Sequence, residues 1–397
     1  MGGEETTIKG ATMLLRNNLF RFEKPDNFQN LSTSRLMNGL VYDFNDPYIP
    51  FFTPIGTRLF NNIENIFKQN AMRIDCNEVI IPQLMTTELL TQGQEIGELF
   101  GRKVMHLSGT MAEFHLLTSP EMMFINMLKK NKIESNALPI HYYFVSNFFR
   151  DMHDPKNILR TKQLRVIAGV SFDKTQNDRL KTENKLLQTL HNTFVDCKVP
   201  FLAEYGSSGF TCEYFYMNSK ETENYIIPSI NPHKKTKALS FAMIYDYGQE
   251  CPFDVLHKNS ITGLKDKTFM TSYAISAQRL LYVIMDSCRD SKGFSIPSNI
   301  RPYDVALITN EQQSDMAQKM ARDLSCSGIS SYIDNMFTKA HVKRLDVADY
   351  IGVGLKIVNK NDKFTVFNRD GEMLITGFAP DLIISAIKDS IIAQKQK

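Results

Sequence analysis

The sequence predicts an α+β protein in which a larger part, built around a mainly antiparallel sheet, is followed by a small α/β domain. Two observations predict this fold class. In the first two thirds of the chain, strand-like apolar runs follow one another and are flanked by long helical patterns. In the last third, strand and helix patterns alternate, which indicates a parallel or mixed sheet covered by helices.

A linker is expected between the two parts. The stretch from Asp290 to Pro302 also contains Gly293 and Pro297, and glycine and proline are the residues that most often interrupt regular structure. We therefore expect an N-terminal extension at 1–30, a first domain at 31–290 and a second domain at 301–397.

The spacing of apolar residues predicts the elements of the first part. A helix is expected over 57–72, where Pro54 pre-sets the entry, and a short buried strand, Glu78–Pro82, is expected after it. Further helices are predicted at 32–40, 120–130, 180–195 and 276–286, and further strands at 201–204, 213–217, 238–247 and 269–275.

The second part alternates strands and helices. Strands are predicted at 304–308, 330–333, 354–358 and 364–368, and helices at 311–324, 339–350 and 381–393. This order is typical of a small α/β domain.

The composition excludes several classes of protein. An apolar share of 43% and a charged share of 22% are ordinary for a soluble globular chain, and a net charge of +3 is too small to attract nucleic acid by bulk charge. No apolar run reaches the roughly 18 residues that a membrane span needs. The 6 cysteines are scattered without a Cys-x-x-Cys pair, which argues against a disulfide scaffold or a zinc site and for a reducing compartment.

The most informative stretch is Leu138–Asp173. It combines an apolar strand that ends at Phe149, a polar loop, and a second apolar strand. Such a hairpin places Arg150 at a strand end and Arg160 in the loop above the sheet. Two guanidinium groups in this arrangement suit a polyphosphate or a carboxylate, because each offers a planar fork of donors and stays charged.

An ordered series of segments resembles the class II aminoacyl-tRNA synthetases, and among them the prolyl-tRNA synthetases of the bacterial and organellar type. The helix and strand from Pro54 to Pro82 are similar to the family's first motif, which builds its dimer interface. The hairpin of Arg150 and Arg160 is similar to the second motif. The third motif, a strand entering a helix that carries an arginine, is matched by Thr271–Arg279.

Two further segments fit this order. Thr118–Glu121 stands where the family holds the proline imino group, and Thr211–Phe215 stands where it has a Ser-His-Glu-Phe strand. The second domain takes the place of the anticodon-binding domain. The resemblance extends from about Leu31 to the C-terminus, so it implies a class II catalytic domain followed by an anticodon-binding-like domain.

The resemblance implies a proline–tRNA ligase, which activates proline with ATP and Mg²⁺ and transfers it to tRNA(Pro). Arg150 and Arg279 would be the catalytic residues, with Arg150 bridging the α-phosphate and the proline carboxylate. Arg160 and Arg279 would hold the β- and γ-phosphates, while Glu121 would pair with the proline nitrogen and Ser119 would add a hydroxyl. No protein ligands for a metal stand out, so Mg²⁺ would arrive with ATP.

Each of these residues also has a purely structural explanation. Glu121 could be a first-turn glutamate favoured by the helix dipole, Arg279 an exposed helix residue and Arg160 a solvated loop residue. Arg150, directly after an apolar strand, is the hardest to explain without a ligand.

Several positions depart from the family pattern. A second-motif glutamate is replaced by Met152, the aromatic that stacks on adenine by Leu164, and a central Gly-His pair by Ala242-Met243. The three glycines of the third motif are replaced by Thr271, Ala274 and Ser276, whose side chains narrow the pocket. The editing insertion of many bacterial relatives is absent, because residues 174–268 are too few to hold it.

These departures leave two alternatives beside the ligase. One is a synthetase-like accessory or binding subunit without catalysis, as in the accessory subunit of the mitochondrial DNA polymerase. The other is a class II synthetase of another specificity, since histidyl, threonyl and glycyl relatives share the scaffold. The joint presence of Arg150, Arg160, Arg279 and Glu121 favours the ligase, because a site without a ligand has no physical reason to keep buried unpaired charges.

Partners and location follow as weaker expectations. A modest basic set in the second domain could contact tRNA phosphates or could be an ordinary solvated face; it comprises Lys339, His341, Lys343, Arg344 and Lys356. A homodimer through the first motif is expected. The segment Met13–Glu23 could begin an organellar targeting sequence or form the first strand, and we expect the mitochondrial matrix rather than the cytoplasm.

Overall fold

The computed structural model describes residues 13–14, 22–46, 49–92, 104–109, 113–154, 157–206, 210–217, 220–221, 225–248 and 254–395. The chain forms two compact units. The large unit contains Phe44–Phe51 and Ile63–Ile284, and the C-terminal unit contains Met1–Asp43, Phe52–Asn62 and Met285–Lys397. Early segments of the chain thus belong to the C-terminal unit, and the division at 290–301 stays a prediction about separate domains.

A seven-stranded sheet in the order β11-β12-β15-β18-β10-β9-β4 forms the centre of the large unit. Neighbouring strands are antiparallel except β4 and β9, which run parallel, so the mainly antiparallel sheet is confirmed. The strands are β4 (Asn77–Glu78), β9 (Ile140–Phe149), β10 (Gln163–Asp173), β11 (Leu202–Tyr205), β12 (Cys212–Tyr216), β15 (Leu239–Gly248) and β18 (Phe269–Ser276).

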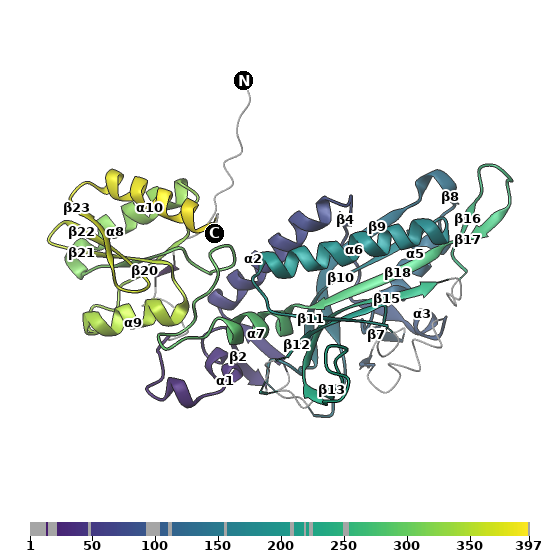
Figure 1. Ribbon diagram of the computed structural model, residues 1–397, viewed down its shortest axis with the longest axis horizontal. Coiled ribbons are helices and arrows are strands. Elements are labelled where there is room, and N and C mark those ends of the chain that lie inside the picture. Colours follow the sequence, from purple (N-terminus) through teal and green to yellow (C-terminus); the bar gives the residue numbers. More distant parts are fainter. Residues whose placement is uncertain are drawn as a thin grey trace, which may run out of the picture. The chain divides into compact units, whose positions relative to one another are not determined.

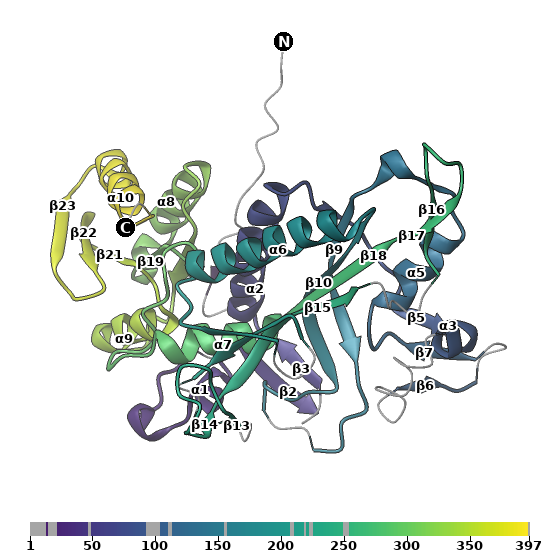
Figure 2. The same ribbon diagram turned by 45° about the vertical axis from the view of Figure 1, so that its right-hand side comes forward.

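Helices cover both faces of this sheet. On one face, Phe67 of α2 (Pro54–Met72) packs edge-on against Tyr143, and α6 (Gln176–Asp196) runs across β10 and β18 (Figures 1 and 2). On the other face, Phe124 of α5 (Glu121–Lys129) lies 5.8 Å from Phe144, measured between ring centroids. Because side chains alternate along a strand, β10 contributes to both layers and is almost entirely buried.

Smaller elements make up the rest of the first two thirds of the chain. Two three-stranded sheets, β5-β7-β6 and β17-β16-β8, and two hairpins, β13-β14 and β2-β3, account for the remaining strands. Their bounds are β2 (Tyr42–Asp46), β3 (Ile49–Phe52), β5 (Leu84–Thr86), β6 (His106–Leu107), β7 (Phe114–Leu116), β8 (Ile133–Glu134), β13 (Tyr225–Ile226), β14 (Thr236–Lys237), β16 (Leu256–Lys258) and β17 (Lys265–Lys267), with helices α1 (Thr33–Met37), α3 (Thr87–Gln92) and α7 (Ala277–Ser287).

The buried strand expected at Glu78–Pro82 is wrong. Only Asn77 and Glu78 pair with β9, and both are exposed. Ile80 is 99% exposed, whereas Val79 and Ile81 are partly buried against the core cluster of the large unit. An apolar run predicts that its side chains contact other apolar side chains, but it does not specify whether these belong to the same chain or to another molecule.

A six-stranded mixed sheet forms the centre of the C-terminal unit, in the order β1-β20-β19-β21-β22-β23. Its first four strands are parallel, and β22 and β23 are antiparallel, which confirms the predicted mixed sheet. The elements are β1 (Met13–Leu14), β19 (Val305–Ile308), α8 (Ser314–Cys326), β20 (Ser331–Asp334), α9 (His341–Ile351), β21 (Leu355–Lys360), β22 (Lys363–Asn368), β23 (Met373–Gly377) and α10 (Pro380–Lys395).

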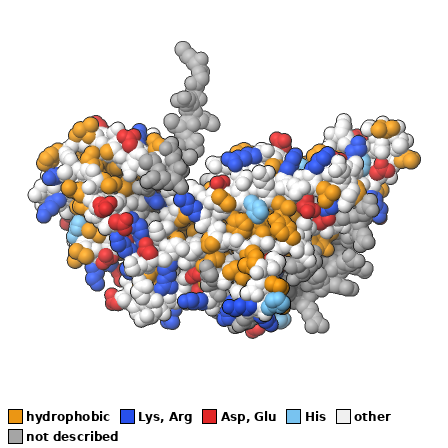
Figure 3. Space-filling model, in the orientation of Figure 1, with side chains coloured by type: hydrophobic (Ala, Val, Ile, Leu, Met, Phe, Trp, Pro, Cys, Tyr) orange, Lys and Arg blue, Asp and Glu red, His pale blue; other side chains and the backbone are white. Residues whose placement is uncertain are grey.

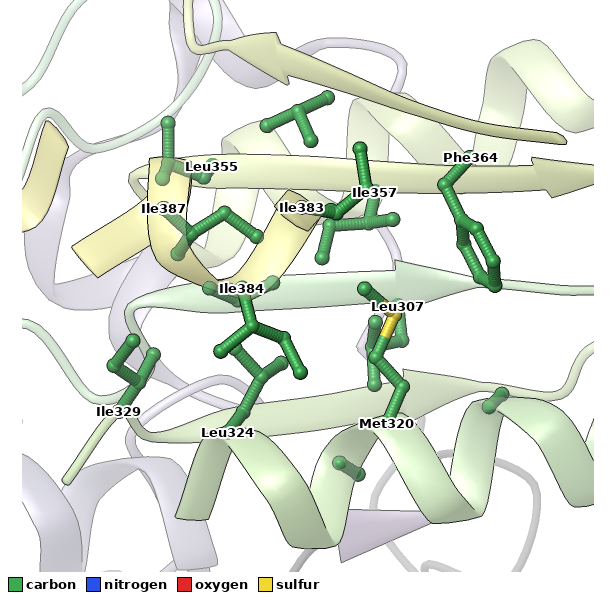
Figure 4. Packing of buried hydrophobic residues seen from close by; sticks show 14 of the residues in the cluster. Leu307, Met320, Leu324, Ile329, Leu355, Ile357, Phe364, Ile383, Ile384 and Ile387 are labelled. Atoms are coloured by element: carbon green, nitrogen blue, oxygen red, sulfur yellow. The ribbon is translucent and has the colours of Figure 1, made fainter. Parts of the chain in front are cut away.

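Aliphatic side chains hold this sheet against α8 and α10. Figure 4 shows Met320 and Leu324 of α8 and Ile383 and Ile387 of α10 facing Leu307 and its neighbours on the sheet. All of these side chains are at most 2% exposed. The packing of two helices on one face of the sheet is what the alternating sequence pattern predicts.

The strand alternative for the N-terminal segment is the one that the structure contains. Met13 and Leu14 pair in parallel with Tyr332 and Ile333 at the edge of the sheet, while residues 1–12 and 15–21 lie outside the described residues.

Two surface properties limit the possible partners. Among the described residues, no helix is long and apolar enough to cross a membrane. Lys and Arg side chains are interspersed with other types on the visible face rather than gathered in one field (Figure 3), in keeping with the net charge of +3.

Candidate active site

The hairpin of β9 and β10 positions the first arginine. Phe149 pairs with Gln163 at the end of the ladder, and the backbone N–H of Arg150 donates to Lys162 O at 2.9 Å. Arg150 therefore follows the strand end directly, as predicted. Its guanidinium is largely buried, and burial lowers the pKa of Arg150, an effect partly offset by the nearby carboxylate of Glu121.

Arg279, at the start of α7, fixes the loop of the same hairpin. Its Nε donates to Leu159 O at 3.2 Å, and its Nη1 donates to Ser240 O at 2.8 Å. The pKa of Arg279 is lowered to about 10. Burial is the largest cause, and the positive charges of Arg150 and Arg160 contribute to the same shift. The three arginines that the sequence singled out are thus close enough to repel one another.

Arg160 completes this cluster from the loop. Its Nε is buried and, among the described residues, has no hydrogen-bond partner. A buried N–H without an acceptor is costly, so it marks a position where a ligand oxygen would be favourable. We name Arg150, Arg160 and Arg279 the arginine cluster.

Glu213 on β12 is a site residue whose role the sequence did not reveal. Its carboxylate accepts a hydrogen bond from Ser240 Oγ, and only 8% of the residue is exposed. Burial raises the pKa of Glu213, while Ser240 and the charge of Arg279 lower it. The signals in the sequence were a carboxylate within an apolar strand, between Cys212 and Tyr214, and the match of Thr211–Phe215 to the Ser-His-Glu-Phe strand of the family.

Ser119 and Glu121 form the opposite side of the site. Ser119 Oγ donates to the Glu121 carboxylate in the first turn of α5. The segment is tied to the hairpin, because the backbone N–H of Phe149 donates to Leu117 O at 2.8 Å. Since Glu121 acts on the pKa of Arg150, the structure brings the predicted proline-binding residues and the arginine cluster together.

Some of the replaced family positions lie on one face of the sheet, whereas Ala242 and Thr271 lie on the other. The register places Glu213 opposite Met243, Met243 opposite Ala274 and Ala274 opposite Ala168, so these side chains form a row. Leu164 belongs to the same apolar cluster as Ala274. The floor of the site is therefore apolar and lined by side chains where glycines would leave room.

The predicted tRNA-binding set needs a correction. Arg344 is 6% exposed, and its Nε donates to Asp334 Oδ1 at 2.9 Å; Lys356 is 3% exposed, and its Nζ lies 2.6 Å from Asp349 Oδ1. Lys339 pairs with Glu23. Arg344 and Lys356 therefore form internal ion pairs and do not contact phosphates. Lys343 remains an exposed member of the set.

No dedicated metal site is found in the part of the chain that the structure describes, where no group of three or more His, Cys, Asp or Glu side chains could hold an ion. Mg²⁺ in nucleotide sites commonly needs only one or two carboxylates plus the phosphates. Glu213, beside the arginine cluster, is compatible with that arrangement.

Known proteins place this site in context. No family model matches the chain. Proline–tRNA ligases of Rickettsia canadensis (strain McKiel) and Rickettsia typhi are 23% and 24% identical over 330 residues, which cover 71% of this chain and 75% and 77% of theirs. The Rickettsia bellii enzyme is 21% identical over 351 residues and covers 77% of this chain and 81% of its own.

Solved structures of prolyl-tRNA synthetases are also similar to this chain. The prolyl-tRNA synthetase of Giardia lamblia in complex with prolyl-adenylate matches with a TM-score of 0.73 at 19% identity, over 95% of this chain and 81% of that one. The Cryptosporidium parvum enzyme with L-proline and AMP matches with a TM-score of 0.72 at 16% identity, over 92% and 75%. The chain thus has the class II fold of the prolyl-tRNA synthetases and is a divergent relative of the bacterial proline–tRNA ligases.

Proposed function

We propose that this protein is a proline–tRNA ligase that activates proline with ATP and transfers it to tRNA(Pro). One observation carries the proposal: Arg150, Arg160 and Arg279 converge beside Glu121, with a buried guanidinium N–H left without an acceptor. Curated relatives named proline–tRNA ligases, and a similar fold bound to prolyl-adenylate, support the same activity.

The geometry supports a division of labour. An amino acid with its cationic nitrogen at Glu121 and its carboxylate at Arg150 would be held by both ends. The remaining arginines would then neutralise the phosphate chain as pyrophosphate leaves, which is the stage at which negative charge builds up. Ser119, already bonded to Glu121, orients that carboxylate toward the nitrogen.

Mg²⁺ belongs to this proposal through ATP. When bound, the ion would neutralise phosphate charge and orient the phosphate oxygens. Glu213 is the buried carboxylate next to Arg279 and is the residue best placed to help hold it.

A homodimer is proposed from the exposed apolar side chains of the first-motif segment. Met72 and Ile80 of this segment and Leu84 just after it are 64%, 99% and 47% exposed, and exposed apolar side chains are typical of an interface. Ile80→Arg would convert the dimer to a monomer, measured by light scattering after size-exclusion chromatography. A wild-type monomer at micromolar concentration would contradict the proposal.

Mitochondrial localisation also stays a proposal, supported only by the composition of the chain and the two arginines near its start. The pairing of Met13 and Leu14 with β20 gives that segment a structural role as well. Fractionation of the source cells with an antibody against the C-terminal unit would decide.

The decisive experiment is ATP–pyrophosphate exchange by the purified protein with each amino acid in turn. We expect exchange with proline alone, despite the side chains of Met243 and Ala274 on the site floor. Exchange with a different amino acid would keep the ligase and change its specificity. No exchange from a folded protein would favour an accessory subunit without catalysis.

A further inference from the structure

A lysine-bearing hairpin projects from the end of the large sheet, away from the arginine cluster. We define the lysine hairpin as residues 256–267, comprising β16, β17 and their turn (Figure 1). It precedes Phe269 at the start of β18, whereas Arg279 follows the other end of that strand. The 8 residues of β18 span about 25 Å, too far for the hairpin to reach a nucleotide bound at the arginines.

The register of the hairpin collects positive charge on one face. Lys258 lies directly opposite Lys265, and Lys267 follows two residues later on the same face. Like charges directly opposite each other destabilise a strand pair, so this arrangement is unfavourable for the hairpin alone. Lys132, beside β8, adds a further exposed lysine next to the neighbouring strand.

Few carboxylates compensate for these lysines. Lys267 lies 3.4 Å from Asp254, and Glu134 on β8 is the cross-strand neighbour of Lys258. Asp266 points to the other face, where it accepts from Asn259 at 2.7 Å. Among the described residues, Lys132, Lys258 and Lys265 have no carboxylate within ion-pair distance.

The turn of the hairpin is pre-organised. Asn259 Oδ1 accepts from the N–H groups of Ile261 at 2.9 Å and Thr262 at 3.2 Å, and the Asn259 N–H donates to Leu264 O at 2.8 Å. These bonds hold the turn without using the side chains of Ile261 and Leu264, which are 91% and 67% exposed. Figure 3 shows apolar side chains at this projecting end. The side chains of Ile261 and Leu264 are thus exposed to solvent rather than packed against the protein.

We infer that the lysine hairpin binds the sugar–phosphate backbone of an RNA, as a tRNA contact on the large unit distinct from the C-terminal unit. A row of lysines that continues from the hairpin to Lys132 suits a chain of phosphates, and Ile261 and Leu264 suit apolar contact with an unstacked base or ribose. A membrane surface would meet the apolar tip first and leave the lysines on the strand face less engaged. The identity of the RNA as tRNA(Pro) rests on the proposed function.

The test compares two variants with the same change in charge. Lys258→Gln/Lys265→Gln alters the hairpin, and Lys185→Gln/Lys198→Gln alters two exposed lysines around α6. The probe is a tRNA(Pro) transcript, titrated against the full-length protein at several salt concentrations. We expect the hairpin variant to bind about fivefold to twentyfold more weakly with a salt slope lower by about 1 to 2, and the α6 variant to match wild type.

A second variant tests the apolar contact. Ile261→Ser/Leu264→Ser should weaken tRNA binding about threefold while leaving the salt slope unchanged, because no phosphate contact is lost. Thermal unfolding of each variant is the control, and we expect it to match that of the wild-type protein.

Equal tRNA binding by the lysine-hairpin variant and the wild-type protein would overturn the inference. So would equal weakening of tRNA binding in both lysine variants. A third contrary outcome is lysine-dependent binding to phosphatidylserine vesicles with tRNA binding unchanged. Proline-dependent exchange is measured on the same samples. Failed exchange with hairpin-dependent tRNA binding would refute the proposed ligase and leave the hairpin assignment standing, so the two failures are distinguishable.

Discussion

The arginine cluster of the large unit is half-buried, and Arg344 and Lys356 of the C-terminal unit are buried, but only the second pair is neutralised by aspartates. Arg344 and Lys356 each meet an aspartate, and Arg369 Nη2 lies 2.7 and 2.8 Å from the two carboxylate oxygens of Asp290. In the large unit, Arg150 and Arg160 contribute to lowering the pKa of Arg279, Glu121 and Glu213 lie nearby, and the buried Nε of Arg160 has no acceptor among the described residues. A compensated buried cation supports the fold, whereas an under-compensated one predicts an anionic ligand.

The largest expected effect is on stability in the C-terminal unit. Arg344→Ala leaves Asp334 buried and uncompensated, so it should lower the free energy of unfolding by about 3–5 kcal/mol. Urea denaturation followed by circular dichroism measures this loss. The double variant Arg344→Met/Asp334→Asn should recover much of it, and equal losses in the two variants would show that the charge is not the cause.

Next in size is the loss of activity at the arginine cluster. Arg150→Ala removes the cation between Glu121 and the phosphates, so we expect proline-dependent pyrophosphate exchange to fall about 10²–10³-fold. The stability should be unchanged or improved, because a repulsive charge is lost. Arg73→Ala, at an exposed arginine of the same unit, serves as the control. Retained exchange would refute the assignment of Arg150.

A third test uses a buried anion in place of a cation. Burial raises the pKa of Asp173 to about 6, although Thr182 Oγ1 donates to it at 2.7 Å. The folded state therefore holds this proton to higher pH than the unfolded chain does. Stability from Asp173 is fully present below about pH 4 and is lost as the pH rises through about 6, by roughly 3 kcal/mol.

Asp173→Asn should remove this dependence and be more stable than wild type at pH 8. Thermal unfolding between pH 4 and pH 8 measures it, and the exposed Asp346→Asn provides the control. Parallel pH profiles for wild type and Asp173→Asn would contradict the explanation.

The counter-charge of the arginine cluster should show a smaller effect. Glu213→Gln keeps an acceptor for Ser240 but removes the negative charge beside Arg279, so the exchange rate should fall about tenfold with the KM for proline unchanged. Glu204→Gln is the matched control, because Glu204 is similarly buried and accepts from the backbone N–H and the hydroxyl of Ser229. Similar losses in both variants would indicate a general strand defect.

The smallest effect is expected at Lys343, which is exposed on α9. Lys343→Gln should weaken tRNA binding about twofold to threefold at low salt and leave exchange unchanged, because one phosphate contact is lost. Filter binding at two salt concentrations is sufficient. An unchanged affinity at both would remove Lys343 from the predicted tRNA surface.

The sequence predicted elements better than it predicted burial. The β9–β10 hairpin, α2, α5, α6 and the alternating C-terminal pattern follow from local spacing and are confirmed. Ile80 looked like core and is exposed, while Arg344 and Lys356 looked like surface and are buried. Local patterns specify which face of an element is apolar, but they do not specify which distant carboxylate will meet a given cation.

The candidate site shows the same limit. The positions of Arg150, Arg160 and Arg279 could be anticipated because strand ends and loops are local features. The pairing of Glu213 with Ser240 could not, because it depends on how β12 and β15 align across a gap of 27 residues. The apolar floor also required the register, since only that places Met243 between Glu213 and Ala274.

The parallel pairing of β1 with β20 has a consequence for how the protein is made. Met13 leaves the ribosome early, but its partner Tyr332 is synthesised about 320 residues later. At about 5–20 residues per second, translation needs roughly 15–60 s to cover that distance. The first strand of the C-terminal sheet therefore waits for its partner, so this sheet can be completed only after about 320 further residues have been synthesised.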